Sequence, residues 1–570
     1  WRADADQVVA ATNLALAQAD VVLVDPGDLD RAAALGDLEM PASLTISARA
    51  RALRATDALV GRLTADLPAD TLVLVVSVVP PAGEWRLTPV IATGADVVRG
   101  YLHSPSTKRL GLVALTDIAP TVLAAVGADV PGAMIGRPLR YHPGEPDVAR
   151  LAGLDDAAAF RQSIYYLTIL GFILFQALVY LLVAAVLRRV RPPAEQPVPP
   201  APGVGALRVA VLAVAAFPLA TYLFRALPFA PRWGWASVPL LVGMTAAIAV
   251  LASRTGTRSP RRPMAPLAWI LGLTLAVLLV DVATGARLQL ASLMGYSPET
   301  VARFYGVGNP TFAVLAATAL LAAALHLEHA PRRREALVAV GALLALVVVV
   351  DGAPGLGDDV GGMLALPIVF ILAMVAFSGR RLSWRPVALA LLATVAVVGL
   401  AVVVDLVRAP DARSHLGRLA AETVDNGQGG LVTTIARKAE ANFRILRTSV
   451  WSWLVPVIAA FGLFVLARGG GADLLPPGSP RRTGLAAALA AGLLGFLVND
   501  SGVIVTAVVL VFVGPFLALA ALAPPNLARP VLWEPSPTQT SPSSDAGPSS
   551  RAGPSSEAGP SPSPAPAAGG

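Results

Sequence analysis

The chain has 570 residues, of which 55% are hydrophobic and only 14% are charged. A single soluble core of this length neither needs nor can cover so much apolar surface, so the composition predicts helices that face lipid. The formal net charge of +7 comes mostly from arginines in short loops beside apolar runs, which argues against nucleic acid as a partner. Because the sequence contains no cysteine, disulfides, thiolate nucleophiles and zinc–thiolate sites are excluded.

The first 160 residues have a different pattern, typical of a water-soluble α/β domain. Helical and strand-like stretches alternate: a helix up to residue 19, a buried strand at 21–24, a helix at 47–67, strands at 72–77 and 89–92, and a helix from 116. Such alternation predicts a mainly parallel sheet with flanking helices. The sequence begins at Trp1 with no export signal before this domain, and we therefore expect an upstream segment.

One stretch of this domain carries a family resemblance. Residues 115–123 read LTDIAPTVL, and they are followed by Gly127, by Val130 and Pro131, and by GRPL at 136–139. This pattern resembles the C-terminal part of the alkaline phosphatase and sulfatase superfamily, and the resemblance covers about a quarter of the chain. It implies an α/β fold, two metal ions held by Asp and His on loops after sheet strands, and a Ser or Thr nucleophile near the first strand.

Most residues that would hold those metal ions are missing. Where the family carries Ser-Asp-His-Gly after a strand, this chain reads SVVP at 77–80. Asp25 keeps a carboxylate after an earlier strand, and Asp28 and Asp30 follow it, but the expected histidine is lacking. A lone histidine such as His103 is more often structural than a metal ligand. The resemblance therefore implies a degenerate, N-terminally truncated phosphatase-like module without a complete two-metal site, suited to a docking role.

Eleven apolar runs follow, each long enough to cross roughly 30 Å of hydrocarbon as a helix. They lie near residues 164–187, 206–224, 235–252, 266–282, 311–327, 336–350, 362–377, 386–407, 451–466, 483–498 and 503–522. Alternate short loops hold most of the arginines, and this set is predicted to be cytoplasmic because positive loops are retained on that side. Residues 1–160 are then predicted to lie outside the cytoplasm.

These patterns divide the chain into three predicted domains. Residues 1–160 form an extracytoplasmic alkaline-phosphatase-like α/β domain, residues 161–523 an all-α polytopic bundle of about 11 transmembrane helices, and residues 524–570 a disordered cytoplasmic tail. The tail is rich in Pro, Ser, Ala and Gly and cannot bury a core. The protein is thus expected to be a multi-pass membrane protein whose main partner is the lipid bilayer. Its outer-loop motifs also resemble those of uncharacterised bacterial membrane proteins in which a similar outer domain precedes the spans, which implies a bacterial protein.

Acidic residues mark the predicted outer ends of four spans: Asp281, Asp351, Asp405 and Asp500. A carboxylate at a helix C-terminus is on the unfavourable end of the helix dipole, so another interaction is expected to hold it. Glycines in the nearby loops permit the non-helical backbone that lines a site at membrane depth. One hypothesis is a divalent metal ion and a phosphate-bearing headgroup at the outer leaflet. Its predicted metal ligands are Asp358, Asp359 and Asp500, and its predicted substrate-binding residues are Arg303, Tyr305, Asn309, Asn499 and Ser501. The alternative is that acidic residues simply accumulate outside and glycines make turns.

Two further loops carry candidate residues. His415, flanked by Arg413 and Arg418 in the long loop after 407, is similar to the periplasmic loops of lipid-linked glycan ligases. His415, Arg413 and Arg303 are therefore the catalytic candidates. The segment LHSPSTKR at 102–109 offers hydroxyls and cations that suit either a phosphate or a solvated loop.

Three classes of function remain open. The arrangement of a phosphatase-like domain before many spans is similar to eukaryotic GPI ethanolamine-phosphate transferases, which favours an envelope-biogenesis transferase acting on a phosphate-containing or lipid-linked substrate. A transporter or flippase would need polar residues near the bilayer midplane, and few are present. A non-catalytic receptor or assembly scaffold is the third class.

Overall fold

Eleven helices in the described part of the chain are long and apolar enough to cross a membrane, which confirms the predicted number of spans. The computed structural model describes residues 3–34, 42–80, 85–94, 96–131, 134, 136–189, 203–227, 230–258, 262–299, 304–408, 429–468 and 471–523. The spans are formed by α5 (Val148–Arg189), α6 (Val204–Arg225), α8 (Val238–Arg258), α9 (Ala265–Ala283), α10 (Asn309–Glu328), α11 (Arg333–Gly352), α12 (Val360–Phe377), α13 (Trp384–Leu406), α16 (Leu454–Arg468), α18 (Pro480–Val498) and α19 (Val503–Ala521). The predicted tail lies outside the described residues.

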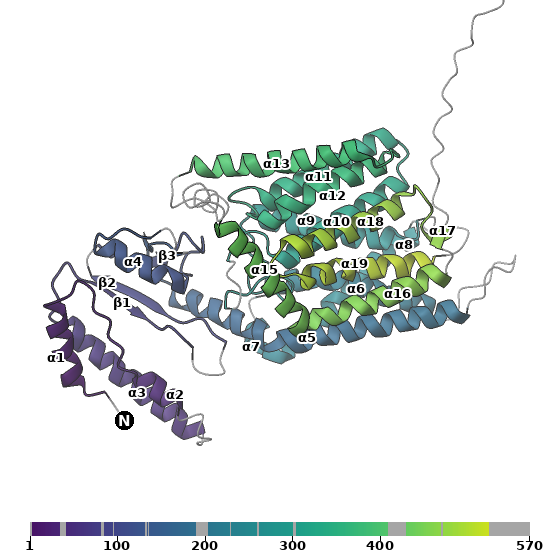
Figure 1. The fold of residues 1–570 in the computed structure, drawn as a ribbon. Coiled ribbons are helices and arrows are strands. Elements are labelled where there is room, and N and C mark those ends of the chain that lie inside the picture. Colours follow the sequence, from purple (N-terminus) through teal and green to yellow (C-terminus); the bar gives the residue numbers. More distant parts are fainter. Residues whose placement is uncertain are drawn as a thin grey trace, which may run out of the picture. The chain divides into compact units, whose positions relative to one another are not determined.

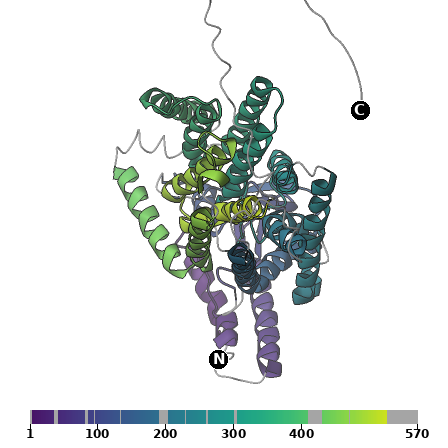
Figure 2. The same cartoon turned by 90° about the vertical axis from the view of Figure 1, so that its right-hand side faces the viewer.

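The spanning helices run roughly parallel to one another, side-on in Figure 1 and close to end-on in Figure 2. Most of α10 and α19 is buried, whereas α13 has few buried residues. Glycines let the central helices approach closely: a Cβ on Gly484 of α18 would lie 2.4 Å from the Cβ of Ala324 on α10. Small residues are what such contacts need, because without a hydrophobic drive between helices in lipid the packing itself must stabilise them.

The two ends of this bundle differ in chemistry. Helices α9, α11, α13 and α18 finish beside the aspartates predicted from the sequence, and α10, α12 and α19 begin there. We call this the carboxylate end. The opposite end, where α5, α8 and α16 finish in arginine, we call the arginine end.

Helix α5 is far longer than a span. Its 42 residues correspond to about 63 Å at a rise of 1.5 Å per residue, roughly twice the thickness of the hydrocarbon. Its polar first part, up to Arg161, therefore continues beyond the apolar run as one helix. The N-terminal region is thus joined to the first span without a flexible break.

The N-terminal region contains small antiparallel sheets where a mainly parallel sheet was predicted. Strand β1 (Leu72–Val76) pairs antiparallel with β2 (Val90–Gly94), and β3 (Gly100–His103) pairs antiparallel with β4 (Arg140–Pro143). The remaining elements are α1 (Ala5–Leu16), α2 (Asp28–Ala34), α3 (Ala42–Thr64), the short helix η1 (Leu115–Asp117) and α4 (Ile118–Ala125). A parallel pair needs a crossover of a dozen or more residues, usually a helix, and no described helix lies between β1 and β2.

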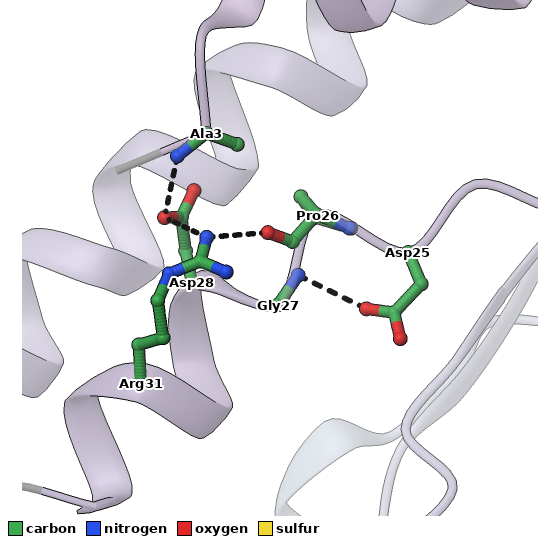
Figure 3. Close-up of polar contacts among 6 residues, drawn as sticks. All are labelled: Ala3, Asp25, Pro26, Gly27, Asp28 and Arg31. Carbon is green, nitrogen blue, oxygen red and sulfur yellow. Dashed lines mark hydrogen bonds and ion pairs between the residues drawn. The ribbon is translucent and has the colours of Figure 1, made fainter. Parts of the chain in front are cut away.

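The strand predicted at residues 21–24 is also absent. These residues form no described helix or strand, and the Leu23 side chain is 93% exposed. The acidic residues that follow serve local structure: Asp25 accepts a hydrogen bond from the Gly27 amide, and Asp28 pairs with Arg31 at 2.8 Å (Figure 3). Periodicity shows that a segment can be a strand, but a strand also needs a neighbour with which to pair.

Asp117 organises the segment that carried the family resemblance. Its side chain is fully buried and accepts hydrogen bonds from the hydroxyls of Ser104 and Ser106, each at 2.6 Å, and from the Arg137 amide at 3.0 Å. It does not cap α4 through its side chain, as the sequence would allow, but ties the loop at 104–107 to residue 137. The hydroxyls of this loop are therefore committed inside the fold.

Helix α15 spans Gly429–Thr448 and precedes α16 in the chain. The Asn442 amide on this helix donates to the Phe496 carbonyl near the end of α18, while Phe443 is 58% exposed. Together, these contacts place one side of α15 against the carboxylate end of the bundle. The short elements α7 (Ala230–Trp233), η2 (Gly234–Ser237), η4 (Val450–Trp453) and α17 (Gly471–Leu474) complete the described structure.

A buried ion pair joins two central helices at the arginine end. Arg481 of α18 and Glu328 of α10 meet through two contacts, Nε to Oε2 at 2.7 Å and Nη2 to Oε1 at 2.6 Å. Both side chains are almost fully buried, so neither charge has water as an alternative partner. Because removing one partner would leave the other charge uncompensated, the pair constrains α10 against α18.

We expect Arg481→Gln or Glu328→Gln alone to lower the free energy of unfolding by about 3–5 kcal/mol, because each strands one buried charge. The double variant should lose less than the sum of the two single variants. Reversible unfolding of the purified protein in detergent measures all three. Arg482→Gln, at the exposed neighbouring position, is the matched control. Additive losses would show that the two charges do not act as a pair.

Candidate functional site

Three of the residues predicted to bind substrate or metal meet at the start of α10. The side-chain amide of Asn309 donates to the Asp500 carboxylate at 2.5 Å and to the Ser501 hydroxyl at 2.6 Å. Asn309 begins α10, whereas Asp500 and Ser501 form the turn between α18 and α19. The structure thus brings together polar groups that are nearly two hundred residues apart in the sequence.

A second polar group surrounds the first turn of α12. A Cβ on Gly362 would lie 1.7 Å from Asp351 Oδ2 and 3.0 Å from Asp359 Oδ2, so both carboxylates reach the same stretch of bare backbone. Asn499 lies against Gly361 in the same way, with its Oδ1 2.0 Å from the position of a Cβ. The helix N-terminus carries partial positive charge, which favours carboxylates at this place. Glycines at 361 and 362 are required because any side chain would displace the acidic and amide groups.

Asn499 is a buried residue whose side-chain amide has an unsatisfied hydrogen-bond donor within the described part of the chain. It is 4% exposed, and its Nδ2 atom has no hydrogen-bond partner among the described residues. A buried polar atom without a partner costs free energy, and such atoms concentrate where a ligand is expected. The sequence placed Asn499 in the substrate-binding set, and the structure places it in a buried polar environment.

Asp358, one of the predicted metal ligands, forms an ion pair that the sequence did not indicate. Its carboxylate pairs with the Lys108 ammonium at 2.9 Å, and the same ammonium lies 3.9 Å above the ring of Tyr305. Lys108 belongs to the N-terminal region, so this contact attaches that region to the loop between α11 and α12. Both Asp358 and Lys108 have positive φ angles, 50° and 53°, a conformation that costs free energy for residues other than glycine.

The loop between α9 and α10 is the largest feature that sequence reasoning missed. Most of its residues from Gln289 to Pro298 are buried, although they form no regular helix or strand. Buried irregular backbone at a membrane boundary must have its carbonyls paired. Cationic side chains do this: Arg109 donates to Ala286, Arg225 to Leu290 and Arg161 to Ser292, at 2.8–3.0 Å. The uncharged run LASLM at 290–294 was the only signal in the sequence.

The aspartates predicted at the ends of α9 and α13 contact residues close to them in the sequence. Asp281 accepts hydrogen bonds from the Leu288 amide at 2.8 Å and from the Gln289 side chain at 3.3 Å, so it holds the start of the same loop. Asp405 lies 3.7 Å from Arg408, three residues further along. These contacts explain why carboxylates are tolerated at helix C-termini despite the helix dipole.

The catalytic candidates Arg303, Arg413 and His415 lie outside the described residues. Among the residues that are described, no group of three or more His, Cys, Asp or Glu side chains is placed to share a metal ion. The metal ligands predicted at Asp358, Asp359 and Asp500 therefore stay a prediction, as does the role of each substrate-binding candidate.

A large cleft connects these groups. Its volume is about 1890 Å³, and its lining includes Asp358, Asp359, Asn499, Asp500 and Ser501 from the bundle. Apolar residues of the N-terminal region line it as well, among them Val78, Trp85, Leu87, Leu151 and Leu154. We call these five bundle residues, with their polar neighbours Asn309 and Tyr305, the polar floor of the cleft, and these apolar residues of the N-terminal region its apolar wall.

Glu299 lines the same cleft and was not predicted. Burial raises the pKa of its carboxyl above the ordinary value, opposed by a hydrogen bond from the Ser297 hydroxyl and by the charge of Arg161. Its Oε1 atom has no hydrogen-bond partner within the described residues. A carboxyl group in a cleft with a raised pKa is suited to proton transfer.

No family model matches the chain, and no curated protein or solved structure matches it either. The resemblance of residues 115–139 to the alkaline phosphatase and sulfatase superfamily has no family evidence behind it. What is shown is a polytopic membrane protein with eleven apolar helices among its described residues.

Because Gly362 leaves room for the carboxylates of Asp351 and Asp359, we expect Gly362→Ala to lower the free energy of unfolding by about 1–3 kcal/mol, the usual cost of overpacking. Gly272→Ala in α9 is the matched control, since a Cβ there meets nothing within 4 Å. It should be neutral or stabilise by up to about 1 kcal/mol. Thermal unfolding in detergent compares the two variants, and equal effects would contradict the packing described around Gly362.

Proposed function

We propose that this multi-pass membrane protein is an enzyme of the bacterial cell envelope that acts on a phosphate-containing or lipid-linked substrate at the outer leaflet. The observation that carries the proposal is the cleft at the carboxylate end, with its apolar wall and its polar floor. An amphiphile matches such a surface because its acyl or isoprenoid part and its headgroup need different surroundings. A transferase or phosphotransferase reaction is the proposed chemistry.

Each part of the polar floor has a proposed role. Asn309, Asn499, Ser501 and Tyr305 would bind the headgroup, together with Arg303 from outside the described residues. Asp359 and Asp500 would hold a divalent metal ion, the proposed cofactor, through oxygen ligands of the kind that hard cations prefer. Asp358 could join them only if Lys108 moved away, since the two now form an ion pair.

Glu299, His415 and Arg413 are the proposed participants in chemistry. The raised pKa of Glu299 supports a role in proton transfer, and its place in the cleft puts it beside the proposed substrate. His415 and Arg413 keep the role that the sequence suggests for them.

Transport has weaker support. Polar side chains inside the spans form local contacts: the hydroxyls of Thr274 and Thr318 donate to carbonyls of their own helices. Arg208 donates to the Leu522 and Pro263 carbonyls at the arginine end. Buried Gln176 in α5 accepts a hydrogen bond from Tyr180. These contacts do not outline a polar path through the described bundle. A non-catalytic scaffold is supported only by the docking of the N-terminal region on the bundle through Lys108.

The proposal requires the carboxylate end to face away from the cytoplasm, as the arginine distribution predicts. The absence of native cysteine makes this simple to measure. A cysteine introduced at exposed Asp129 should react with a membrane-impermeant maleimide in intact cells, whereas one at exposed Arg334 should react only after lysis. The reverse labelling would place the cleft on the cytoplasmic side and contradict the proposal.

The catalytic proposal is tested by measuring bound metal and phosphodiester or phosphotransfer turnover of the purified protein in lipid. Asp359→Asn and Asp500→Asn should each reduce both quantities, since each removes a charged metal ligand. Asp473→Asn, an exposed carboxylate at the arginine end, is the control and should change neither. Full metal content and turnover in both site variants would exclude this site as the metal-dependent centre.

A further inference from the structure

Two arginines, one buried and one partly buried, line the same small cavity at the carboxylate end, next to the cleft. Arg161 of α5 is 7% exposed, and Arg225 at the end of α6 is partly buried. Both donate their Nε hydrogen to the loop between α9 and α10, Arg161 to Ser292 at 2.9 Å and Arg225 to Leu290 at 2.8 Å. One nitrogen of each guanidinium is therefore used to hold the loop.

The terminal nitrogens of both guanidinium groups remain available. Within the described part of the chain, Nη1 and Nη2 of Arg161 and of Arg225 donate no hydrogen bond, and no carboxylate lies within 4 Å of either group. Because these nitrogens have no partner in that part of the chain and are not fully buried, they are accessible to a ligand or to solvent. Arg161 is held flat against Tyr165, with its guanidinium carbon 4.4 Å from the ring centre.

A small cavity of about 30 Å³ is lined by both side chains. Arg161, Arg225, Thr221 and Ser292 give it a polar lining, and Phe160, Ile164, Phe224 and Leu227 enclose it. Arg161 and Leu293 line both this cavity and the large cleft, so the two spaces adjoin. Two guanidinium groups, each held by its Nε, thus line one cavity that also has polar groups from Thr221 and Ser292.

We infer that Arg161 and Arg225 form a phosphate-binding subsite. Arginine presents parallel N–H groups that match the oxygens of a phosphate, and such charge-assisted hydrogen bonds are roughly twice as strong as neutral ones. The alternative, that both arginines only hold the loop, uses one nitrogen of each and leaves their terminal nitrogens without an acceptor among the described residues. An anion in the cavity would supply that acceptor, and Arg109, which binds the same loop, adds positive potential.

The position of the cavity suits a phosphate carried on a lipid. Pro231 of α7 lines it, and Trp233 and Trp235, which follow directly, are 57% and 48% exposed. Exposed tryptophans of this kind prefer the membrane–water interface, where headgroup phosphates lie. The subsite deepens the proposed function because it names the residues that bind the phosphate of the proposed substrate. Its link to a reaction rests on that proposed function, but binding at the subsite is measurable without turnover.

The test is binding of two probes to the full chain in a maltoside detergent, which contains no phosphate. The probes are inorganic pyrophosphate and a short-chain phosphatidic acid. Binding of each probe is measured by titration and by the rise in the thermal stability of the protein. At least one probe should bind the wild-type protein with saturation, and Arg161→Gln and Arg225→Gln should each weaken it roughly tenfold or more. Arg232→Gln, an exposed arginine of the adjacent helix, should leave binding unchanged.

The two probes distinguish the source of the phosphate. Binding of the lipid alone identifies a headgroup site, and arginine-dependent binding of pyrophosphate identifies a site for free phosphates. Arg161→Lys and Arg225→Lys keep the positive charge and would be used if a Gln variant did not fold. They should weaken phosphate binding because lysine cannot donate two parallel bonds, while they unfold as the wild-type protein does. Absence of binding to the wild-type protein, or equal binding by all arginine variants, would overturn the subsite. Binding without catalytic turnover would leave the subsite standing and sink only the proposed reaction.

Discussion

Irregular backbone at the boundary of a membrane must have its carbonyls and amides paired within the protein, and at the carboxylate end this requirement is met by cationic side chains. Arg161, Arg225 and Arg109 come from three different elements, yet all donate to carbonyls of one loop between α9 and α10. Without these hydrogen bonds the loop could not stay buried. Its buried course in turn orders the start of α10, since Gln289 accepts a hydrogen bond from the Gly308 amide.

The same constraint links the N-terminal region to the bundle. Arg109 follows Lys108, and the two side chains contact different bundle loops: Lys108 pairs with Asp358, while Arg109 also donates to the Phe304 carbonyl. The buried Asp117 side chain accepts hydrogen bonds from Ser104 and Ser106, in the loop that carries these two basic residues. A chain of polar contacts thus runs from the core of the N-terminal region to the residues that line the cleft. The apolar wall of the cleft therefore depends on this series of polar contacts.

The spans were predictable because hydrophobic length is a local property of the sequence. The site was predictable in part for a related reason: a glycine beside polar residues at 499–502 marks the turn between two spans, and the structure brings Asn309, Asp500 and Ser501 together. The glycines at 361–362, by contrast, lie in the first turn of α12. The loop between α9 and α10 was not predictable, because its stabilising bonds join residues 65 to 177 positions apart. The sheet was predicted with the wrong pairing, since alternation of helices and strands says nothing about which strand edges meet.

The docking of Lys108 on Asp358, together with the hydrogen bonds of Arg109, holds the N-terminal region at the polar floor, and chemical cross-linking measures this proximity directly. In a chain without native cysteine, Lys108→Cys and Asp358→Cys should be joined by a short bis-methanethiosulfonate reagent, and mass spectrometry after proteolysis would show the two peptides linked. Lys108→Cys combined with Asp473→Cys, at the opposite end of the bundle, should yield no link. Absence of the first link in a folded protein, or equal yields from the two pairs, would contradict a cleft walled by the N-terminal region.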